Sequence, residues 1–406
     1  MAQVINTNVM SLNAQRNLNS SGTSLATSIQ RLSSGMRINS AKDDAAGLAI
    51  SERFTTQIRG LDVATRNAND GISLAQTAEG AMVEISNNLQ RIRELAVQSA
   101  NATNSASDRK ALQAEVTQLT AEIDRVARQT NFNGTTLLDG SFSGALFQVG
   151  ADAGQTIGIN AITNARADKL GGAMFTSGTI AVANPAATGS GSANGHAATT
   201  IAAGTITIAG VALDAIDVPA SAQTYATAAD AQAAGKLAVG NALAAAINAK
   251  TGDNGLTATV SATGDVSLAS WKEGAVGATI TQTGLAAGVG ALTSTALTAA
   301  NAKFAKDLDI SSFAGSQQAL QIVDKALTAV SSARADMGAI QNRFASTIAN
   351  LSTTSENLSA SRSRIRDTDY AKETAELTRT QILQQAGTAM LSQANSSTSN
   401  VLSLLQ

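Results

Sequence analysis

A seven-residue spacing of apolar side chains runs through the C-terminal flank of the chain. The residues in this series are Val323, Val330, Met337, Phe344, Leu351, Leu358 and Ile365. An apolar stripe sustained over six such steps is typical of a helix that packs against other helices. The spacing therefore predicts one long helix, with this stripe as the seam of a bundle or coiled coil.

The N-terminal flank offers partners for that helix. Small and apolar residues recur at helical spacing over residues 64–96, and again over residues 112–126. Ser107 followed by Asp108 suits the start of the second stretch, because such residues cap helix N-termini. We expect three helices that pack on one another.

The middle of the chain has a different character. Asn133-Gly134 and Asp139-Gly140 are turn dipeptides, which predict a small hairpin region over residues 131–160. Residues 171–300 hold 18 of the 33 glycines and no arginine, and both prolines lie there. This composition favours short strands with glycine turns, interrupted by one helix at about residues 226–249. The predicted fold class is mainly α: long terminal helices in a coiled coil or bundle, a β-hairpin region, and a variable, largely β central insert.

Both ends of the chain carry almost no charge. Arg16 is the only ionisable side chain in residues 1–30, and residues 380–406 contain none. Two faces are expected here for self-assembly. The N-terminal face consists of Leu18, Leu25, Ile29, Leu32 and Met36, and the C-terminal face of Leu383, Met390, Val401 and Leu405. On the C-terminal face the spacing is nearer to eleven residues than to seven. Since exposed helix faces usually carry Lys, Glu and Arg, these ends are expected to be enclosed by other protein. Their few large side chains do not offset the entropy of ordering the backbone, so we expect both ends to be loose in the monomer.

Composition excludes several classes of function. The chain has no cysteine, one histidine and a net charge of −2, which argues against thiolate catalysis, cysteine-ligated zinc and nucleic-acid binding. We expect no enzyme activity, cofactor or metal; His196 is interpreted as a solvated loop residue, and Asp43 and Asp44 as surface or capping acids. No segment is apolar enough to span a membrane, and the N-terminus has no basic start or apolar run of a signal peptide. Taken alone, the lack of a signal peptide and of a membrane-spanning segment indicates a cytoplasmic protein. A protein that uses a dedicated export route would lack these segments too.

Several long segments resemble one family. They are RLSSGMRINSAKDDAAGLAIS at 31–51, LQRIRELAVQSAN at 89–101, EIDRVARQTNFNGTTLLDG at 122–140 and the final VLSLLQ. Together they closely resemble bacterial flagellin over roughly residues 1–165 and 305–406. The resemblance implies a terminal coiled-coil core from 1–44 and 367–406, a helical bundle with hairpin from 45–175 and 305–366, and outer domains from 176–304.

The resemblance also implies a function and partners. Flagellins polymerise with themselves into the hollow, extracellular filament of the bacterial flagellum, after unfolded export by the flagellar type III machine without a cleaved signal peptide. Their partners are an export chaperone, the filament cap and hook–filament junction proteins. The main alternative is a hook–filament junction protein or another axial protein of the same architecture.

Host recognition is implied for three groups of residues. The surface read by the animal toll-like receptor corresponds to Gln90, Arg91, Arg93, Glu94, Leu95 and Glu115. The plant receptor epitope corresponds to Gln30, Gly35, Asp43, Asp44 and Gly47. The tail read by NAIP-type sensors corresponds to Val401, Leu402, Leu404 and Leu405.

Overall fold

The computed structural model describes residues 7–189, 194–221, 223–284 and 288–403, with the backbone alone for 398–403. The chain forms two compact units, one from residues 1–70, 146–157 and 343–406 and the other from residues 71–145 and 158–342. Among the described residues the α-helices are α1 (Val9–Ser34), α2 (Ala45–Ser99), α3 (Ala106–Gln129), α4 (Ala228–Ala249), α5 (Thr251–Asn254), α6 (Phe313–Arg366) and α7 (Tyr370–Ser403).

Short strands occupy the middle of the sequence. They are β1 (Asn131–Phe132), β2 (Thr135–Thr136), β3 (Ala145–Gln148), β4 (Thr156–Ile159), β5 (Ala173–Val182), β6 (Ala187–Thr188), β7 (Gly195–His196), β8 (Thr199–Ile201), β9 (Thr207–Ile208), β10 (Val211–Ala212), β11 (Ile216–Val218), β12 (Leu256–Val260), β13 (Val266–Glu273), β14 (Gln282–Thr283), β15 (Val289–Ser294) and β16 (Ala302–Lys303). Long helices at both ends and a largely β insert confirm the predicted fold class.

The seven-residue series lies in the single helix α6, as predicted. Its first five members, from Val323 to Leu351, are buried, and Leu358 and Ile365 are half-buried. Leu351 packs with Leu61 and Ala64 of α2 within the first unit. The predicted stripe of α2 is buried throughout: Ala64, Ala68, Gly71, Ala75, Ala78, Met82, Ile85, Leu89, Ile92 and Ala96.

The start of α3 differs from the prediction. Ser105, not Ser107, is the N-cap: its side chain accepts a hydrogen bond from the backbone N–H of Asp108, and the Asp108 carboxylate accepts one from the Ser105 N–H. This reciprocal capping box requires a spacing of three residues between cap and acid. Ser107 is too close to Asp108 to form it.

The two turn dipeptides lie at turns. Asn133 and Gly134 both have positive φ, 49° and 80°, and connect β1 to β2 as a tight hairpin. Asp139 Oδ1 accepts a hydrogen bond from the Ser141 N–H before Phe142 enters the core. Strands β3 and β4 form a second two-stranded sheet.

The central insert has a core of its own. Its main sheet has the order β12-β13-β5-β15, all antiparallel, and its buried residues include Ile180, Val266 and Leu268. Helix α4 packs on this core through Val239 and Leu243. The predicted helix in the insert is therefore confirmed to within two residues of its start.

His196 is buried, so the expectation of a solvated loop residue was wrong. It lies in β7 and is only 7% exposed. Gly235 of α4 allows this close packing, because a Cβ there would lie 2.7 Å from the Cβ of His196. The Gly/Ala/Ser-rich surroundings of His196, interpreted as loop sequence, instead provide small residues that let a helix approach a strand.

Candidate assembly surface

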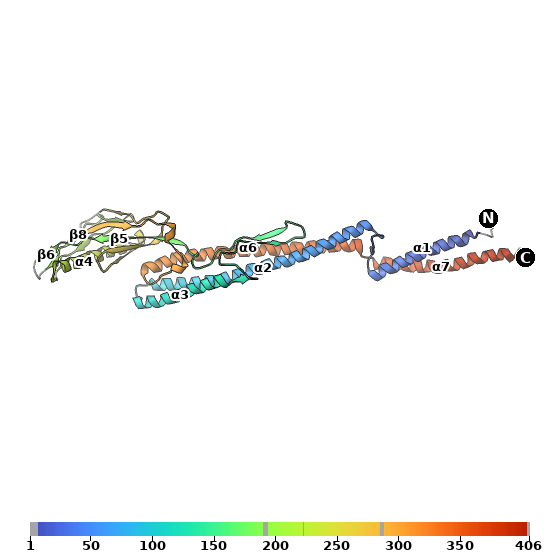
Figure 1. The fold of residues 1–406 in the computed structure, drawn as a ribbon, viewed down its shortest axis with the longest axis horizontal. Coiled ribbons are helices and arrows are strands. Elements are labelled where there is room, and N and C mark those ends of the chain that lie inside the picture. Colours follow the sequence, from blue (N-terminus) through green and yellow to red (C-terminus); the bar gives the residue numbers. More distant parts are fainter. Residues whose placement is uncertain (1–6, 190–193, 222, 285–287, 404–406) are drawn as a thin grey trace. The chain divides into compact units, whose positions relative to one another are not determined.

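The first unit brings the two ends of the chain together. Helices α1 and α7 lie side by side and run in opposite directions (Figure 1). At one end Asn8 Nδ2 donates to the carbonyl of Ala394 at 2.9 Å, and at the other Arg31 lies 3.9 Å from the carboxylate of Glu373. The two ends of the sequence, which carry few charges, thus form an antiparallel helix pair.

The contact side of α1 has a regular spacing of three and four residues. Its buried or half-buried members are Ser11, Ala14, Leu18, Ser21, Leu25, Ser28 and Leu32. Three of the predicted N-terminal residues, Leu18, Leu25 and Leu32, belong to this side. Ile29 does not, because 52% of it is exposed. Met36 lies beyond the helix, where its Sδ accepts a hydrogen bond from Nε of Arg366 at 3.1 Å.

The contact side of α7 differs from the predicted face. Its buried or half-buried members are Glu373, Leu377, Thr380, Gly387, Leu391 and Ala394, again at a spacing of three, four or seven residues. The face predicted from the eleven-residue spacing is therefore a different side of α7 from this contact, and its role in self-assembly stays a prediction. Leu383 and Met390 are exposed, by 46% and 62%, so they contribute little to the pairing with α1.

The last predicted residues fall outside what can be described in full. Val401 and Leu402 lie in the helical backbone of α7, but their side chains are not described. Leu404 and Leu405 are outside the described residues.

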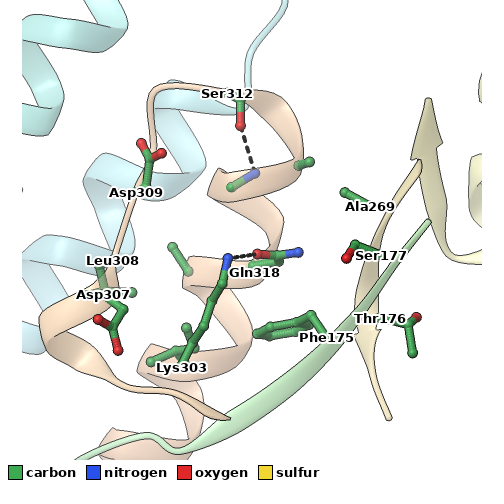
Figure 2. Close-up of a pocket in the computed structure, with 14 residues that line it drawn as sticks. Phe175, Thr176, Ser177, Ala269, Lys303, Asp307, Leu308, Asp309, Ser312 and Gln318 are labelled. Atoms are coloured by element: carbon green, nitrogen blue, oxygen red, sulfur yellow. Dashed lines mark hydrogen bonds between the residues drawn. The ribbon is translucent and has the colours of Figure 1, made fainter. Parts of the chain in front are cut away.

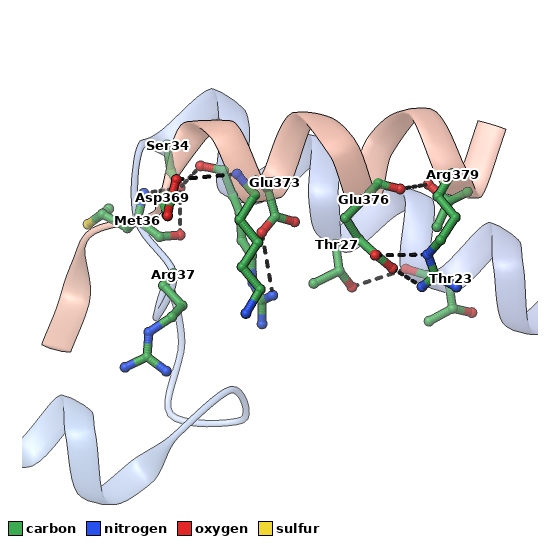
Figure 3. A network of polar contacts seen from close by, with 12 residues as sticks. Thr23, Thr27, Ser34, Met36, Arg37, Asp369, Glu373, Glu376 and Arg379 are labelled. Carbon is green, nitrogen blue, oxygen red and sulfur yellow. Dashed lines mark hydrogen bonds and ion pairs between the residues drawn. The ribbon is translucent and has the colours of Figure 1, made fainter. Parts of the chain in front are cut away.

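Polar and charged side chains also lie along the helix pair. Figure 3 shows Glu373, Glu376 and Arg379 on α7, and Thr23 and Thr27 on α1. Arg379 Nε donates to Glu376 at 2.9 Å within α7. The Glu373 side chain is only 11% exposed, so its pairing with Arg31 takes place largely away from solvent.

The connection between α1 and α2 is held by local hydrogen bonds. Gly35 ends α1 with φ of 71°, and its N–H donates to the carbonyl of Arg31. Asp43 accepts from the backbone N–H groups of Ser40 and Asn39, and these bonds lower the pKa of Asp43 below its ordinary value.

Asp44, at the end of the connection next to α2, also accepts a backbone hydrogen bond. Asp44 accepts from the N–H of Gly47 in the first turn of α2, at 2.8 Å. Asp44 is thus a capping acid of α2 and Asp43 an exposed surface acid, in agreement with the interpretation of the two as surface or capping acids. Gly47 is buried. A Cβ at this position would lie 2.7 Å from the side chain of Ile38, so the close packing here requires glycine. Gln30, in contrast, is exposed on α1.

A hairpin contacts α6 within the first unit. The rings of Phe147 in β3 and Phe344 in α6 meet edge to face, with centroids 5.6 Å apart. Asn67 of α2 donates to the carbonyl of Gln148 at 3.0 Å. Beside them, Leu146 is 77% exposed.

The charged residues of α2 form ion pairs with neighbouring helices of the second unit. Arg91 Nε lies 2.8 Å from Glu115 of α3, and this hydrogen bond raises the pKa of Arg91. Arg93 lies 2.7 Å from Asp324 of α6. All four side chains are about half exposed, so each pair contributes little to stability.

The other residues of this charged group differ in exposure. Gln90 and Glu94 are exposed on α2, and Glu94 pairs with Arg91. Leu95 has no exposed surface. It lies in the bundle core and is not part of the exposed surface of this group.

The second unit contains a cavity of about 260 Å³. It lies between the first turns of α6 and strand β5, where Figure 2 shows Lys303 pointing at Gln318. Lys303 Nζ donates to Gln318 Oε1 at 2.9 Å, and Gln318 donates to the carbonyl of Ser270 at 2.6 Å. Because these polar groups form hydrogen bonds with one another, we interpret them as a polar link between α6 and the sheet that lines the cavity.

Metal-ligating groups and apolar helices were also sought in the part of the chain that the structure describes. No group of three or more metal-ligating side chains occurs among residues 7–189, 194–221, 223–284 and 288–403. None of the described helices has an apolar stretch long enough to cross a membrane.

Comparisons with known proteins agree with this arrangement. The bacterial flagellin N-terminal helical region matches residues 5–143, and the bacterial flagellin C-terminal helical region matches residues 320–405. Flagellin A of Vibrio anguillarum is 44% identical over 413 residues, and flagellin B of Vibrio cholerae is 42% identical over 418 residues. B-type flagellin of Pseudomonas aeruginosa is 41% identical over 499 residues. In all three comparisons the match covers 100% of both chains.

The two family regions coincide with the long helices, including α1, α2, α6 and α7, and the unmatched middle coincides with the β insert. The chain therefore belongs to the bacterial flagellin family and is a structural subunit of the extracellular flagellar filament rather than an enzyme.

Proposed function

We propose that the helix pair α1–α7 is the part of this flagellin that forms the core of the filament, and that its neighbours complete it. The observation that carries the proposal is the exposure of Ile382, Leu383 and Met390 on a helix without a charged side chain from residue 380 onward. Such a surface lacks the charges that normally solvate an exposed helix face. Packing against other copies removes these side chains from water.

The same reasoning assigns roles to the rest of the chain. Residues 1–44 and 367–406 form the terminal core, and residues 45–175 and 305–366 form the bundle that contacts neighbours. Residues 176–304 form the outer part. The terminal core is loosely ordered in the monomer and becomes rigid on assembly, so that ordering and polymerisation are coupled.

This coupling fits export of an unfolded chain. The subunit passes through the flagellar type III machine without cleavage of a signal peptide, after a chaperone has held its C-terminal tail. It then adds at the distal end of a filament that begins at hook–filament junction proteins and ends at a cap. A terminal segment with few large apolar residues unfolds at low cost, which suits this route.

Host receptors read surfaces that serve packing in the polymer. The toll-like receptor surface consists of Gln90, Arg91, Arg93, Glu94 and Glu115, with the buried Leu95 supporting it from beneath. The plant receptor reads the connection that contains Gln30, Gly35, Asp43, Asp44 and Gly47. NAIP-type sensors read the tail with Val401, Leu402, Leu404 and Leu405.

Deletion of residues 380–406 tests the proposal. The truncated chain should remain soluble, keep its folded bundle and fail to polymerise onto filament seeds, as seen by electron microscopy. Seeded growth of the truncated chain would refute the role of the helix pair. The full chain should form long helical filaments, whereas a hook–filament junction protein would form none, or only short caps.

A further inference from the structure

Asn133-Gly134 forms the tip of the hairpin between β1 and β2. The chain contains two more Asn-Gly dipeptides, Asn194-Gly195 and Asn254-Gly255. In such a dipeptide the backbone nitrogen of glycine can reach the side-chain amide carbon of asparagine and close a five-membered ring. Glycine favours this reaction because it has no side chain to obstruct the approach. The structure places the three dipeptides in very different surroundings.

We propose that Asn133 is a site of spontaneous deamidation in the folded protein, and that the fold protects Asn194 and Asn254 from the same reaction. The backbone nitrogen of Gly134 loses its proton to solvent and forms a bond with Cγ of Asn133. The Cγ–Nδ2 bond then breaks, and Nδ2 leaves as ammonia. Water opens the resulting succinimide at either carbonyl, which leaves aspartate or isoaspartate. The reaction consumes water, releases ammonia and involves no oxidation or reduction.

Both reacting groups are available at the hairpin tip. Asn133 and Gly134 are exposed. Within the described residues, neither the side-chain amide of Asn133 nor the N–H of Gly134 has a hydrogen-bond partner. A Cβ built on Gly134 would meet no atom within 4 Å, so the tip has room for solvent and for the ring.

The hairpin is also short enough to open. Ring closure requires a backbone conformation that differs from the tight turn, in which Asn133 has φ of 49°. Strands β1 and β2 have only two residues each and form a two-stranded sheet of their own. Isolated pairs of this size are marginally stable, so local opening of the tip has a low free-energy cost.

Asn254-Gly255 is held at both reacting groups. Asn254 is only 6% exposed. Its Nδ2 donates to the carbonyl of Ile247 at 3.1 Å, and its Oδ1 accepts from the N–H of Leu256 at 2.8 Å. The N–H of Gly255 donates to the carbonyl of Thr251 at 3.0 Å. Ring closure here would break buried hydrogen bonds, which is costly.

Asn194-Gly195 is protected mainly by burial. Asn194 is 5% exposed, and its Nδ2 donates to the carbonyl of Tyr225 at 3.5 Å. Gly195 is paired with Thr188 between β7 and β6. Solvent must reach the dipeptide to remove the proton and to open the ring, so burial slows both steps.

Asp139-Gly140 has the same ring-forming spacing close to the hairpin. Asp139 Oδ1 accepts hydrogen bonds from the hydroxyl and the N–H of Ser141, at 2.6 and 2.9 Å. These bonds lower the pKa of Asp139 and keep its carboxyl group ionised. Ring closure at an aspartate proceeds from the neutral acid, which loses water. Asp139 is therefore held in its unreactive form.

The two products should affect the bundle differently. Leu137 and Leu138 follow β2 and have no exposed surface. A two-residue hairpin with positive φ at both central residues suits Asp-Gly as well as Asn-Gly, so the aspartate form retains the turn. Isoaspartate adds a methylene group to the main chain and disrupts it. The isoaspartate form should therefore anchor the two leucines less firmly.

Ageing of the full chain tests the proposal. The chain is incubated in mildly alkaline buffer, once folded and once in guanidinium chloride, and mass spectrometry of chromatographically separated peptides follows asparagine, aspartate and isoaspartate at each position. In guanidinium chloride the three Asn-Gly dipeptides should react at similar rates. In the folded chain Asn133 should stay within about tenfold of its unfolded rate, whereas Asn194 and Asn254 should slow by at least about a hundredfold. Slowing of Asn133 as strong as that of Asn254, or no slowing at Asn194 and Asn254, would overturn the proposal.

Matched variants test the role of the product. Aged wild-type chain should unfold at a lower denaturant concentration than fresh chain, as followed by circular dichroism. Asn133→Gln should keep the midpoint of its fresh form, because glutamine would have to close a less favourable six-membered ring. An equal loss in both chains would show that the change does not arise at Asn133. Fresh Asn133→Asp carries the added charge without the methylene group and should unfold close to fresh wild type. A midpoint as low as that of the aged chain would contradict the role of isoaspartate.

Discussion

Leu18 of α1 lies directly against Gly387 of α7. A Cβ built on Gly387 would be 3.2 Å from Cδ1 of Leu18, so the two helices approach closely at this point. Nearer the start of α1 and the end of α7, the Ser11 hydroxyl donates a hydrogen bond of 2.8 Å to Oδ1 of Asn395. The pairing of the two termini thus depends on small residues and polar contacts as much as on leucines.

Gly387→Leu should weaken the filament. The added side chain enters the space that Leu18 occupies, and overpacking of this kind typically costs about 1–3 kcal/mol. We expect depolymerisation at a lower temperature than for wild type, measured by light scattering on heating. Gln385→Leu places the same side chain on an exposed position of α7 that does not contact α1, and serves as the control. Filaments of Gly387→Leu as stable as wild type would contradict the close contact.

Ser105→Ala should destabilise the bundle through the start of α3. The substitution removes one half of the capping box with Asp108, and loss of an N-cap costs about 0.5–2 kcal/mol. Urea unfolding followed by circular dichroism measures the change in the free energy of unfolding. Thr103→Ala, in the turn just before the cap, should change it by less than the Ser105 variant.

The same cap should respond to acid. Hydrogen bonds from the side chain and backbone of Ser105 lower the pKa of Asp108 below its ordinary value of 3.8. A group whose pKa is lowered by folding contributes stability above its unfolded pKa, and loses it as the pH falls through the folded pKa. The difference in free energy of unfolding between wild type and Asp108→Asn should be constant from about pH 5 to 7 and shrink below about pH 4. A difference that grows in acid would contradict this assignment.

Oxidation of Met390 should inhibit assembly. Hydrogen peroxide transfers one oxygen atom to Sδ and leaves as water, which turns an apolar side chain into a polar sulfoxide. Met390 is 62% exposed on α7, so it is accessible in the monomer, and the proposed packing against other copies covers it in the filament. Peroxide-treated monomer should polymerise more slowly than untreated monomer.

Two variants separate Met390 from the other exposed methionine on these helices. Met390→Leu should retain its rate of polymerisation after treatment, whereas Met10→Leu should remain sensitive. Equal sensitivity of both variants would show that the effect does not depend on Met390.

The long helices were predictable because their contact sides are continuous stripes of apolar and small residues. The series from Val323 to Ile365 lies in one helix, and the stripe of α2 is buried as expected. Periodicity identifies such helices because burial of the stripe is what positions them. The β character of the insert followed instead from its composition, which is rich in glycine and free of arginine.

The contact side of α7 could not be found in this way. Thr380, Gly387 and Glu373 are not apolar, yet they face α1, while Leu383 and Met390 point away from it. Apolar spacing alone therefore selected these exposed residues instead of the side that contacts α1. A signal was present in the sequence all the same, because Glu373, Thr380, Gly387 and Ala394 recur every seven residues.

Hydrogen exchange of the backbone amides of residues 380–397 tests the central claim most directly. Exchange followed by mass spectrometry compares dilute monomer with filament at the same pH and temperature. If assembly with other copies orders the ends of the chain, these amides should exchange rapidly in the monomer and slowly in the filament. Strong protection of the same amides already in the dilute monomer would contradict the account.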